Sequence, residues 1–353
     1  IGNKTKIYKF DNTIDIKGYS DVEIDFCGAT ILDNVQDIFP ADRGAPLFTL
    51  YNSDNIKLHS FIYSVELTRA NVGSSSIPTV IIWVGGQAVG ALETSKIEIY
   101  NIKFENPLDG FMPISLEGEL AGAYIHDIDV IGDWLYGINI EYGGVPEDNS
   151  SNPTFENGKH AYNVLVENFN GKDMPNCEGF LRVASCFNIK FLNCVGQNVK
   201  HFIYNYSGDR NISRVSENIV YENCKNHYDS TGIDIGTNYC VSIIFVDRDG
   251  STGEVLPSWT NYNHTVKFIN CEFQNNDLVD STCIRHYGNQ GKTVFDSCIF
   301  RDSYYGFRTG PSSNPSYTSN NSLTIRDCIF KNNVLDLYIL SEKNILIDNC
   351  KFI

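Results

Sequence analysis

The sequence is poor in positive charge. It has 27 Lys and Arg residues against 43 Asp and Glu residues, which gives a formal net charge of −16. A protein that binds along a nucleic-acid backbone needs a basic surface, and anionic membranes attract basic segments. The composition therefore disfavours nucleic acids and membrane surfaces as partners.

Long apolar runs and cysteine-pair motifs are also missing. No apolar run reaches the roughly 20 residues of a spanning helix, so we expect no membrane insertion. The 11 Cys residues are an odd number, and none has the C-x-x-C or Cys/His spacing of a zinc site. We interpret them as reduced, buried thiols that act as small hydrophobic residues, with disulfides or a metal as the alternative. Free thiols are typical of folding in a reducing cytoplasm.

The sequence has instead an internal repeat of the form apolar–x–apolar–x–polar–apolar. Alternation with a period of two predicts a strand. The Asn or Asp that follows favours a tight bend, because its side chain hydrogen-bonds nearby backbone. Clear copies occupy residues 189–194, 219–224, 266–271, 323–328 and 345–350, and looser copies have Cys27, Phe61, Ile102, Ile128, Phe169 and Cys298 in the last position.

This repeat predicts an all-β solenoid. The shortest interval, from Cys328 to Cys350, is 22 residues. A coil of that length with three short strands indicates a right-handed parallel β-helix of about eleven coils. We expect it to span residues 18–353, after a lead-in of residues 1–17. Like residues should stack at one bend, with each amide bonded to the next, at Asn101, Asn168, Asn193, Asn223, Asn270 and Asn349.

A second strand recurs between the copies of the repeat, and its outward positions carry chemically active side chains. Insertions at 143–160, 248–264 and 309–321 follow this strand, so we expect them to flank one sheet as walls. A walled groove with carboxylates, arginines and aromatic rings suits an extended carbohydrate. The candidate catalytic residues are Glu117, Glu141 and Asp234, and the candidate substrate-binding residues are Asn139, Arg182, Arg285, Tyr287, Arg308 and Tyr338.

Glu117 and Glu141 form the leading catalytic pair. Glycoside hydrolysis uses two carboxyl groups, about 5–5.5 Å apart for retention and about 6.5–9.5 Å apart for inversion. Their separation of 24 positions matches one coil, so both should point outward from adjacent coils. Like charges at that distance raise one pKa, as an acid catalyst requires. The alternative is two solvated surface glutamates. Asp234 beside Arg285 is the second candidate, and a surface ion pair is its alternative.

The chain resembles the pectate-lyase-like β-helix superfamily. Its opening is similar to the first coil of bacteriophage tailspikes and related polysaccharide-degrading β-helices. The residues that carry this similarity are Gly-Tyr-Ser-Asp-Val-Glu-Ile-Asp-Phe-Cys-Gly-Ala-Thr-Ile at positions 18–31. Three features favour a tailspike: the free thiols, the two ends, which suggest a piece of a longer protein, and the content of 20 Tyr and 21 Phe residues. The resemblance implies a homotrimer in the virion tail, folded in the host cytoplasm; a secreted protein is the alternative.

We therefore expect a tailspike-like depolymerase of bacterial surface polysaccharide, and an endo-glycosidase before a lyase. In a lyase, Arg182, Arg285 or Arg308 would neutralise a uronate, although the net charge repels a polyanion at long range. A non-catalytic carbohydrate-binding adhesin is the runner-up, and a cellular polysaccharide lyase or epimerase is a further candidate. We expect no cofactor. Asp247 and Asp249 lie in a segment with a faint likeness to a calcium loop, for which a polar hairpin is the alternative.

Overall fold

In the computed structural model, strands are the only regular secondary structure of the described part of the chain. No helix there is long and apolar enough to cross a membrane. The described residues are 6–36, 38–39, 43–66, 69, 79–86, 93–105, 107, 110–118, 120–141, 161–184, 186–207, 216–228, 239–245, 265–275, 281–288, 291–309, 322–340 and 344–353.

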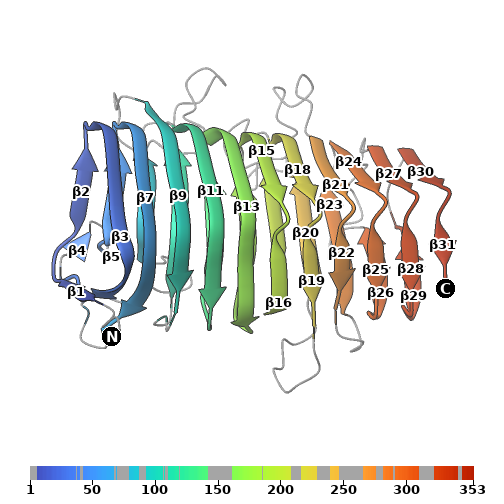
Figure 1. The fold of residues 1–353 in the computed structure, drawn as a ribbon. Helices are drawn as coiled ribbons and strands as arrows, with labels where there is room; N and C mark the ends of the chain where they lie inside the picture. Colours follow the sequence, from blue (N-terminus) through green and yellow to red (C-terminus); the bar gives the residue numbers. More distant parts are fainter. Residues whose placement is uncertain are drawn as a thin grey trace, which may run out of the picture.

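Two parallel sheets run the length of the molecule, and their strands follow one another in sequence order along one axis (Figure 1). We call the sheet with 11 described strands sheet B. Its strands are β2 (Ile14–Lys17), β6 (Phe48–Tyr51), β8 (Thr79–Gly86), β10 (Phe111–Gly118), β12 (Tyr136–Glu141), β14 (Gly179–Ala184), β17 (Ile203–Ser207), β20 (Tyr239–Phe245), β23 (Thr282–Gly288), β26 (Tyr305–Thr309) and β29 (Leu335–Tyr338).

Sheet A has 18 described strands, and each strand of sheet B is followed in the chain by a sheet A segment with a bend. Its strands are β1 (Ile7–Phe10), β3 (Ser20–Asp33), β7 (Asp54–Val65), β9 (Thr94–Phe104), β11 (Leu120–Ile131), β13 (Ala161–Met174), β15 (Phe187–Leu192), β16 (Val195–Val199), β18 (Glu217–Glu222), β19 (Lys225–His227), β21 (Thr265–Ile269), β22 (Glu272–Gln274), β24 (Lys292–Asp296), β25 (Ile299–Arg301), β27 (Ser322–Arg326), β28 (Ile329–Lys331), β30 (Asn344–Asp348) and β31 (Lys351–Phe352). From β15 onward the bend divides each segment into two strands. A short antiparallel pair, β4 (Ile38–Phe39) and β5 (Arg43–Gly44), forms a third, two-stranded sheet.

This arrangement confirms the predicted all-β parallel β-helix. One sheet B strand and the two halves of one sheet A segment make one turn of the solenoid, which we call a rung. The number of rungs and the division at residue 18 stay predictions. Within the expected lead-in, β1 already pairs with β3, and β2 with β6.

The polar residue of the repeat makes the bend in sheet A. The backbone φ is 56° at Asn193, 55° at Asn223 and 49° at Asn349. Asn and Asp adopt this left-handed conformation more readily than other non-glycine residues. Of the expected amide stack, one bond joins two amides, from Asn223 to Asn193 (3.2 Å). The other amides donate to a hydroxyl or carboxylate at the same bend of the preceding rung, from Asn101 to Ser60 (3.1 Å), Asn168 to Asp127 (2.9 Å) and Asn349 to Asp327 (2.5 Å).

The last position of the repeat places cysteines inside the solenoid. Burial raises the pKa of the Cys271 and Cys298 thiols well above the ordinary value. The Cys271 thiol donates to the carbonyl oxygen of Tyr221 on the preceding rung, with an Sγ–O distance of 3.4 Å. All eleven cysteines are free, and nine are buried, whereas Cys27 is exposed and Cys350 is half-buried. The prediction of a buried thiol column is thus confirmed for its central rungs.

The placement of Cys27 in that column is wrong. Cys27 and Gly28 both have positive φ angles, 53° and 76°, so they form the bend itself. The register between β3 and β7 shifts there, and Ala29 instead pairs with Phe61. Three residues of β3, at positions 26–28, therefore lie opposite the single residue Ser60 of β7, and the two extra residues place Cys27 at the surface.

Aromatic rings fill the core beside the thiols. The rings of Phe191, Tyr221, Phe268 and Phe295 stack on successive rungs, with centroid distances of 4.9, 4.9 and 4.6 Å. These distances match the strand spacing of about 4.8 Å, so each ring contacts its counterpart one rung away. His286 is also fully buried and hydrogen-bonds Thr293 at 3.0 Å, which fits a structural role.

The amide stack predicts different costs for two substitutions at one bend. Asn223→Ala should lower the free energy of unfolding by about 2 kcal/mol, because it removes a hydrogen bond and places a Cβ in the left-handed region. Asn223→Gly should cost less, because glycine adopts positive φ without strain. Urea denaturation of both variants measures the difference. Equal costs, or a larger cost for Gly, would contradict this account of the bend.

Thiol accessibility should separate Cys27 from the column. Ellman's reagent is expected to react rapidly with Cys27 in the native protein, because it is the exposed thiol. All eleven thiols should titrate after denaturation. Cys27→Ser should abolish the rapid phase and leave the slow one. Rapid reaction of several thiols in that variant would show that the column is not buried.

Candidate functional site

Outward side chains of sheet B form one continuous column across eight rungs. Each member pairs in register with the next, from β10 to β29. At a strand spacing of about 4.8 Å the column is about 34 Å long. We call it the B column, and its members are Ser115, Asn139, Arg182, Tyr204, Ser242, Arg285, Arg308 and Tyr338.

Glu117 and Glu141 lie beside the first part of the B column. They pair directly across β10 and β12, so the sequence correctly placed them in the same position of adjacent rungs. Their exposures differ: Glu117 is only 3% exposed, whereas the side chain of Glu141 is 25% exposed. Glu117 is therefore not the solvated surface residue of the alternative interpretation.

Gly85 on β8 lets the backbone of Glu117 approach closely. It pairs with Glu117 and has a φ of 91°. A Cβ at this position would lie 1.8 Å from the Glu117 carbonyl oxygen. Only glycine fits here, because both the φ angle and the contact exclude a side chain.

A chain of hydrogen bonds joins the two glutamates. Arg182 donates to Glu141 (2.7 Å) and to the amide oxygen of Asn139. Asn139 then donates to Ser115 (3.1 Å), and the Ser115 hydroxyl donates to Glu117 (2.5 Å). Three rungs thus hold the two carboxylates through one connected network. Such a network fixes the positions of its members better than isolated contacts do.

The electrostatics of this end centre on Arg182. Burial alone would lower the pKa of the Arg182 guanidinium, but the ion pair with Glu141 raises it, so the side chain remains charged. The guanidinium also lies over the Tyr136 ring, 5.5 Å from its centroid. Burial raises the pKa of Tyr204, the next member of the B column, so its hydroxyl remains protonated at neutral pH.

The other end of the B column combines arginine with tyrosine. Arg285 lies over the Tyr239 ring at 4.7 Å, and Arg308 lies over the Tyr305 ring at 5.1 Å and the Tyr338 ring at 5.9 Å. The Tyr305 and Tyr338 rings are 5.4 Å apart. This end presents cationic groups and aromatic faces, which suit the polar and apolar sides of a sugar.

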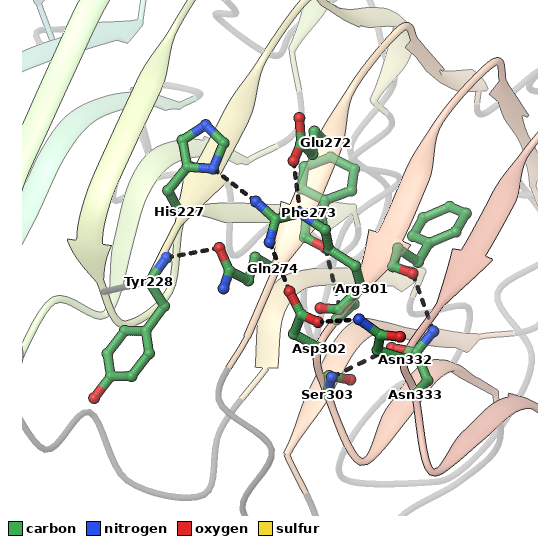
Figure 2. A network of polar contacts seen from close by, with 12 residues as sticks. His227, Tyr228, Glu272, Phe273, Gln274, Arg301, Asp302, Ser303, Asn332 and Asn333 are labelled. Atoms are coloured by element: carbon green, nitrogen blue, oxygen red, sulfur yellow. Dashed lines mark hydrogen bonds and ion pairs between the residues drawn. The ribbon is translucent and has the colours of Figure 1, made fainter. Parts of the chain in front are cut away.

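A separate polar network lies on sheet A, away from the B column (Figure 2). Arg301 donates to Glu272 (2.6 Å), Asp302 (2.6 Å) and the Nδ1 atom of His227 (3.2 Å). Burial lowers the pKa of His227, which agrees with a neutral ring that accepts this hydrogen bond. Asn332 extends the network to the next rung through Asp302 (3.1 Å). These groups satisfy one another across strands, so the network joins rungs and offers no open site.

Some predicted site residues lie outside the described part of the chain. They are Asp234, the side chain of Tyr287, and both members of the faint calcium loop, Asp247 and Asp249. Nearly all of the three expected wall insertions also falls there. The described residues contain no group of three or more His, Cys, Asp or Glu side chains that would hold a metal.

The sequence interpretation missed several members of the site. Ser115 completes the hydrogen-bond chain, Tyr204 belongs to the B column, and Tyr136, Tyr239 and Tyr305 support the arginines. One signal was available, because these last three tyrosines are the first residues of their sheet B strands. Alignment of the strands on their first residues would have found them.

Comparison with solved structures supports the parallel β-helix fold. No family model and no curated protein matches the sequence. Among solved structures, the chain is similar to an endo-xylogalacturonan hydrolase from Aspergillus tubingensis, with a TM-score of 0.50, 12% identity, and coverage of 96% of this chain and 90% of that one. This likeness shows a shared parallel β-helix, as the sequence resemblance implied.

Two further solved structures have lower scores. A tailspike protein of E. coli bacteriophage HK620, in complex with a pentasaccharide, has a TM-score of 0.44 and 12% identity; coverage is 92% of this chain and 46% of that one. The Streptococcus pneumoniae surface protein and adhesin PfbA has a TM-score of 0.43 and 11% identity, with coverage of 99% and 90%. This chain thus spans about half the length of that tailspike protein.

The contact at Gly85 predicts a local loss of stability. Gly85→Ala should lower the free energy of unfolding by at least about 2 kcal/mol, through a clash with Glu117 and a strained φ. Gly18→Ala is the matched control, because Gly18 also has positive φ (72°) but no atom within 4 Å of a built Cβ. Chemical denaturation compares the two. A cost for Gly85→Ala no larger than the control's would contradict the close approach.

Proposed function

We propose that the outward face of sheet B binds an extended bacterial surface polysaccharide. We propose further that it hydrolyses internal glycosidic bonds of that polysaccharide, as a tailspike-like depolymerase. The observation that carries the proposal is the in-register pair of Glu117 and Glu141 at one end of a long polar and aromatic column. A straight column repeated at the rung spacing suits a polymer better than a compact ligand. The fold shared with a polysaccharide hydrolase is consistent with this function.

The two glutamates have environments suited to different roles. Burial disfavours the charged form of a carboxyl group, so the buried Glu117 is the candidate proton donor to the glycosidic oxygen. Glu141 is paired with Arg182 and is the candidate ionised partner. It would act at the anomeric carbon, either directly as nucleophile or as base toward a water. Asn139 and Ser115 would hold the pair in place.

A binding-only adhesin is the second candidate, and one observation favours it. Glu117 is 3% exposed, and an acid catalyst has to reach the substrate. In an adhesin the B column would still bind the polysaccharide, but Glu117 and Arg182 would only stabilise the outward face of sheet B. A lyase or epimerase remains the third candidate, with the arginines of the column placed against a uronate.

We also propose the assembly and location that the tailspike resemblance implies, a homotrimer in a virion tail that folds in the host cytoplasm. Light scattering measures the mass of the native assembly. A stable monomer of the full-length protein would contradict the trimer and would leave the sugar-binding proposal standing.

Conservative substitutions test the catalytic pair. Glu117→Gln removes the proton that the acid would donate, and Glu141→Gln removes the negative charge, each with little change in shape. Each substitution should therefore abolish cleavage and preserve the fold. Glu217→Gln, on sheet A, is the matched control and should cleave like the wild type. The assay measures new reducing ends released from a panel of purified bacterial capsular polysaccharides, together with the ultraviolet absorbance of an unsaturated uronate.

Each outcome selects one candidate. New reducing ends without that absorbance, and their loss in both variants, support the hydrolase. Cleavage with the absorbance supports the lyase. Wild-type cleavage in both variants would remove this pair from the mechanism. Binding without any cleavage by the wild type would support the adhesin.

A further inference from the structure

We propose that His227 and Arg301 form a pH-sensitive connection between rungs of sheet A, which is closed near neutral pH and opens when the His227 ring takes up a proton. We call these two residues, together with Glu272 and Asp302, the histidine latch. The latch lies on sheet A, away from the B column, and does not depend on the proposed function.

One guanidinium holds the latch together (Figure 2). The Nε atom of Arg301 donates to Glu272 (2.6 Å), and its Nη1 atom donates to Asp302 (2.6 Å). Its Nη2 atom donates to the Nδ1 atom of His227 (3.2 Å). Because β22 pairs with β19 on one side and with β25 on the other, the Arg301 side chain reaches across one rung to His227. A single side chain therefore connects three successive rungs.

The hydrogen bond from Arg301 fixes the protonation state that the His227 ring must have. A guanidinium donates hydrogen bonds and accepts none, so the Nδ1 atom has to supply a lone pair. The proton of the neutral ring then lies on Nε2. A second proton, on Nδ1, removes the acceptor and turns two N–H groups toward each other. The bond between Arg301 and His227 therefore exists only while the ring is neutral.

The surroundings of the ring favour this neutral form. Burial lowers the pKa of His227, and the charges of Arg301 and Lys225 lower it further, against an opposing effect of Glu272. Burial alone would lower the pKa of Arg301, but its bonds to Glu272 and Asp302 raise it, so the guanidinium stays charged. The polar and charged side chains placed around the ring by the described strands are Gln197 on β16, Lys225 on β19, Glu272 and Gln274 on β22, and Arg301 and Asp302 at the end of β25.

Acidification should therefore weaken the latch. The pKa of His227 lies below its ordinary value of 6.5 in the folded protein, so the unfolded chain takes up this proton more readily. The contribution of the latch to stability is present above that pH and is lost as the pH falls below it. Arg301 keeps its charge over this range, so the ring is the group that titrates.

Amide hydrogen exchange measured by mass spectrometry tests the latch. The protein is compared at about pH 7.5 and about pH 5, with rates corrected for the pH dependence of unstructured amides. In the wild type, the protection of β19, β22 and β25 should fall about tenfold more between the two conditions than the protection of β13, because only the first three strands carry the latch.

Two substitutions separate the acceptor from its titration. His227→Asn keeps an acceptor oxygen close to the position of Nδ1 that takes up no proton in this range, so the additional loss at acidic pH should disappear. His227→Leu removes the acceptor, so protection should be low under both conditions. His59→Asn, also on sheet A, is the matched control and should behave like the wild type at these strands.

An equal loss of protection in His227→Asn and in the wild type would overturn the latch. So would a wild type whose three latch strands lose no more protection than β13, and this measurement decides the matter even where a variant fails to fold. Neither result bears on carbohydrate binding by sheet B.

Discussion

Hydrogen bonds between in-register parallel strands are the constraint on which the rest of this structure depends. Each rung pairs with its neighbours along both sheets, so a side chain meets the same position one rung away. Like residues can then satisfy one another. Asn223 hydrogen-bonds Asn193 at one bend, and the Phe268 ring stacks on Tyr221 in the core. The sequence repeats because each position has to fit the same position of the rungs beside it.

The same constraint assembles the candidate site from distant parts of the chain. Ser115 and Tyr338 are far apart in sequence, yet both belong to one outward column of sheet B. A substitution on one rung changes one side chain of that column and leaves the pairing of the strands in place. The solenoid therefore lets its two ends acquire different chemistry, with carboxylates near Glu141 and cations at Arg285 and Arg308.

Periodicity made the fold and much of the site predictable from the sequence. Alternation fixed the outward direction of Glu117 and Arg182, and the coil length placed Glu117 beside Glu141. Two features were out of reach. The displacement of Cys27 depends on a two-residue bend that keeps the apolar alternation, and the burial of Glu117 depends on packing against its surroundings. The first is a local change of backbone conformation and the second a matter of tertiary packing, and a pattern of residue types encodes neither.

The strand spacing also fixes distances along the B column. Glu141 on β12 and Tyr338 on β29 are six rungs apart, which is about 29 Å at the strand spacing. If a polymer lies along the column, as proposed above, each side chain of the column meets it at a fixed distance from the bond beside Glu141. The hydrogen bonds between rungs therefore relate every contact with the polymer to the position of the reacting bond.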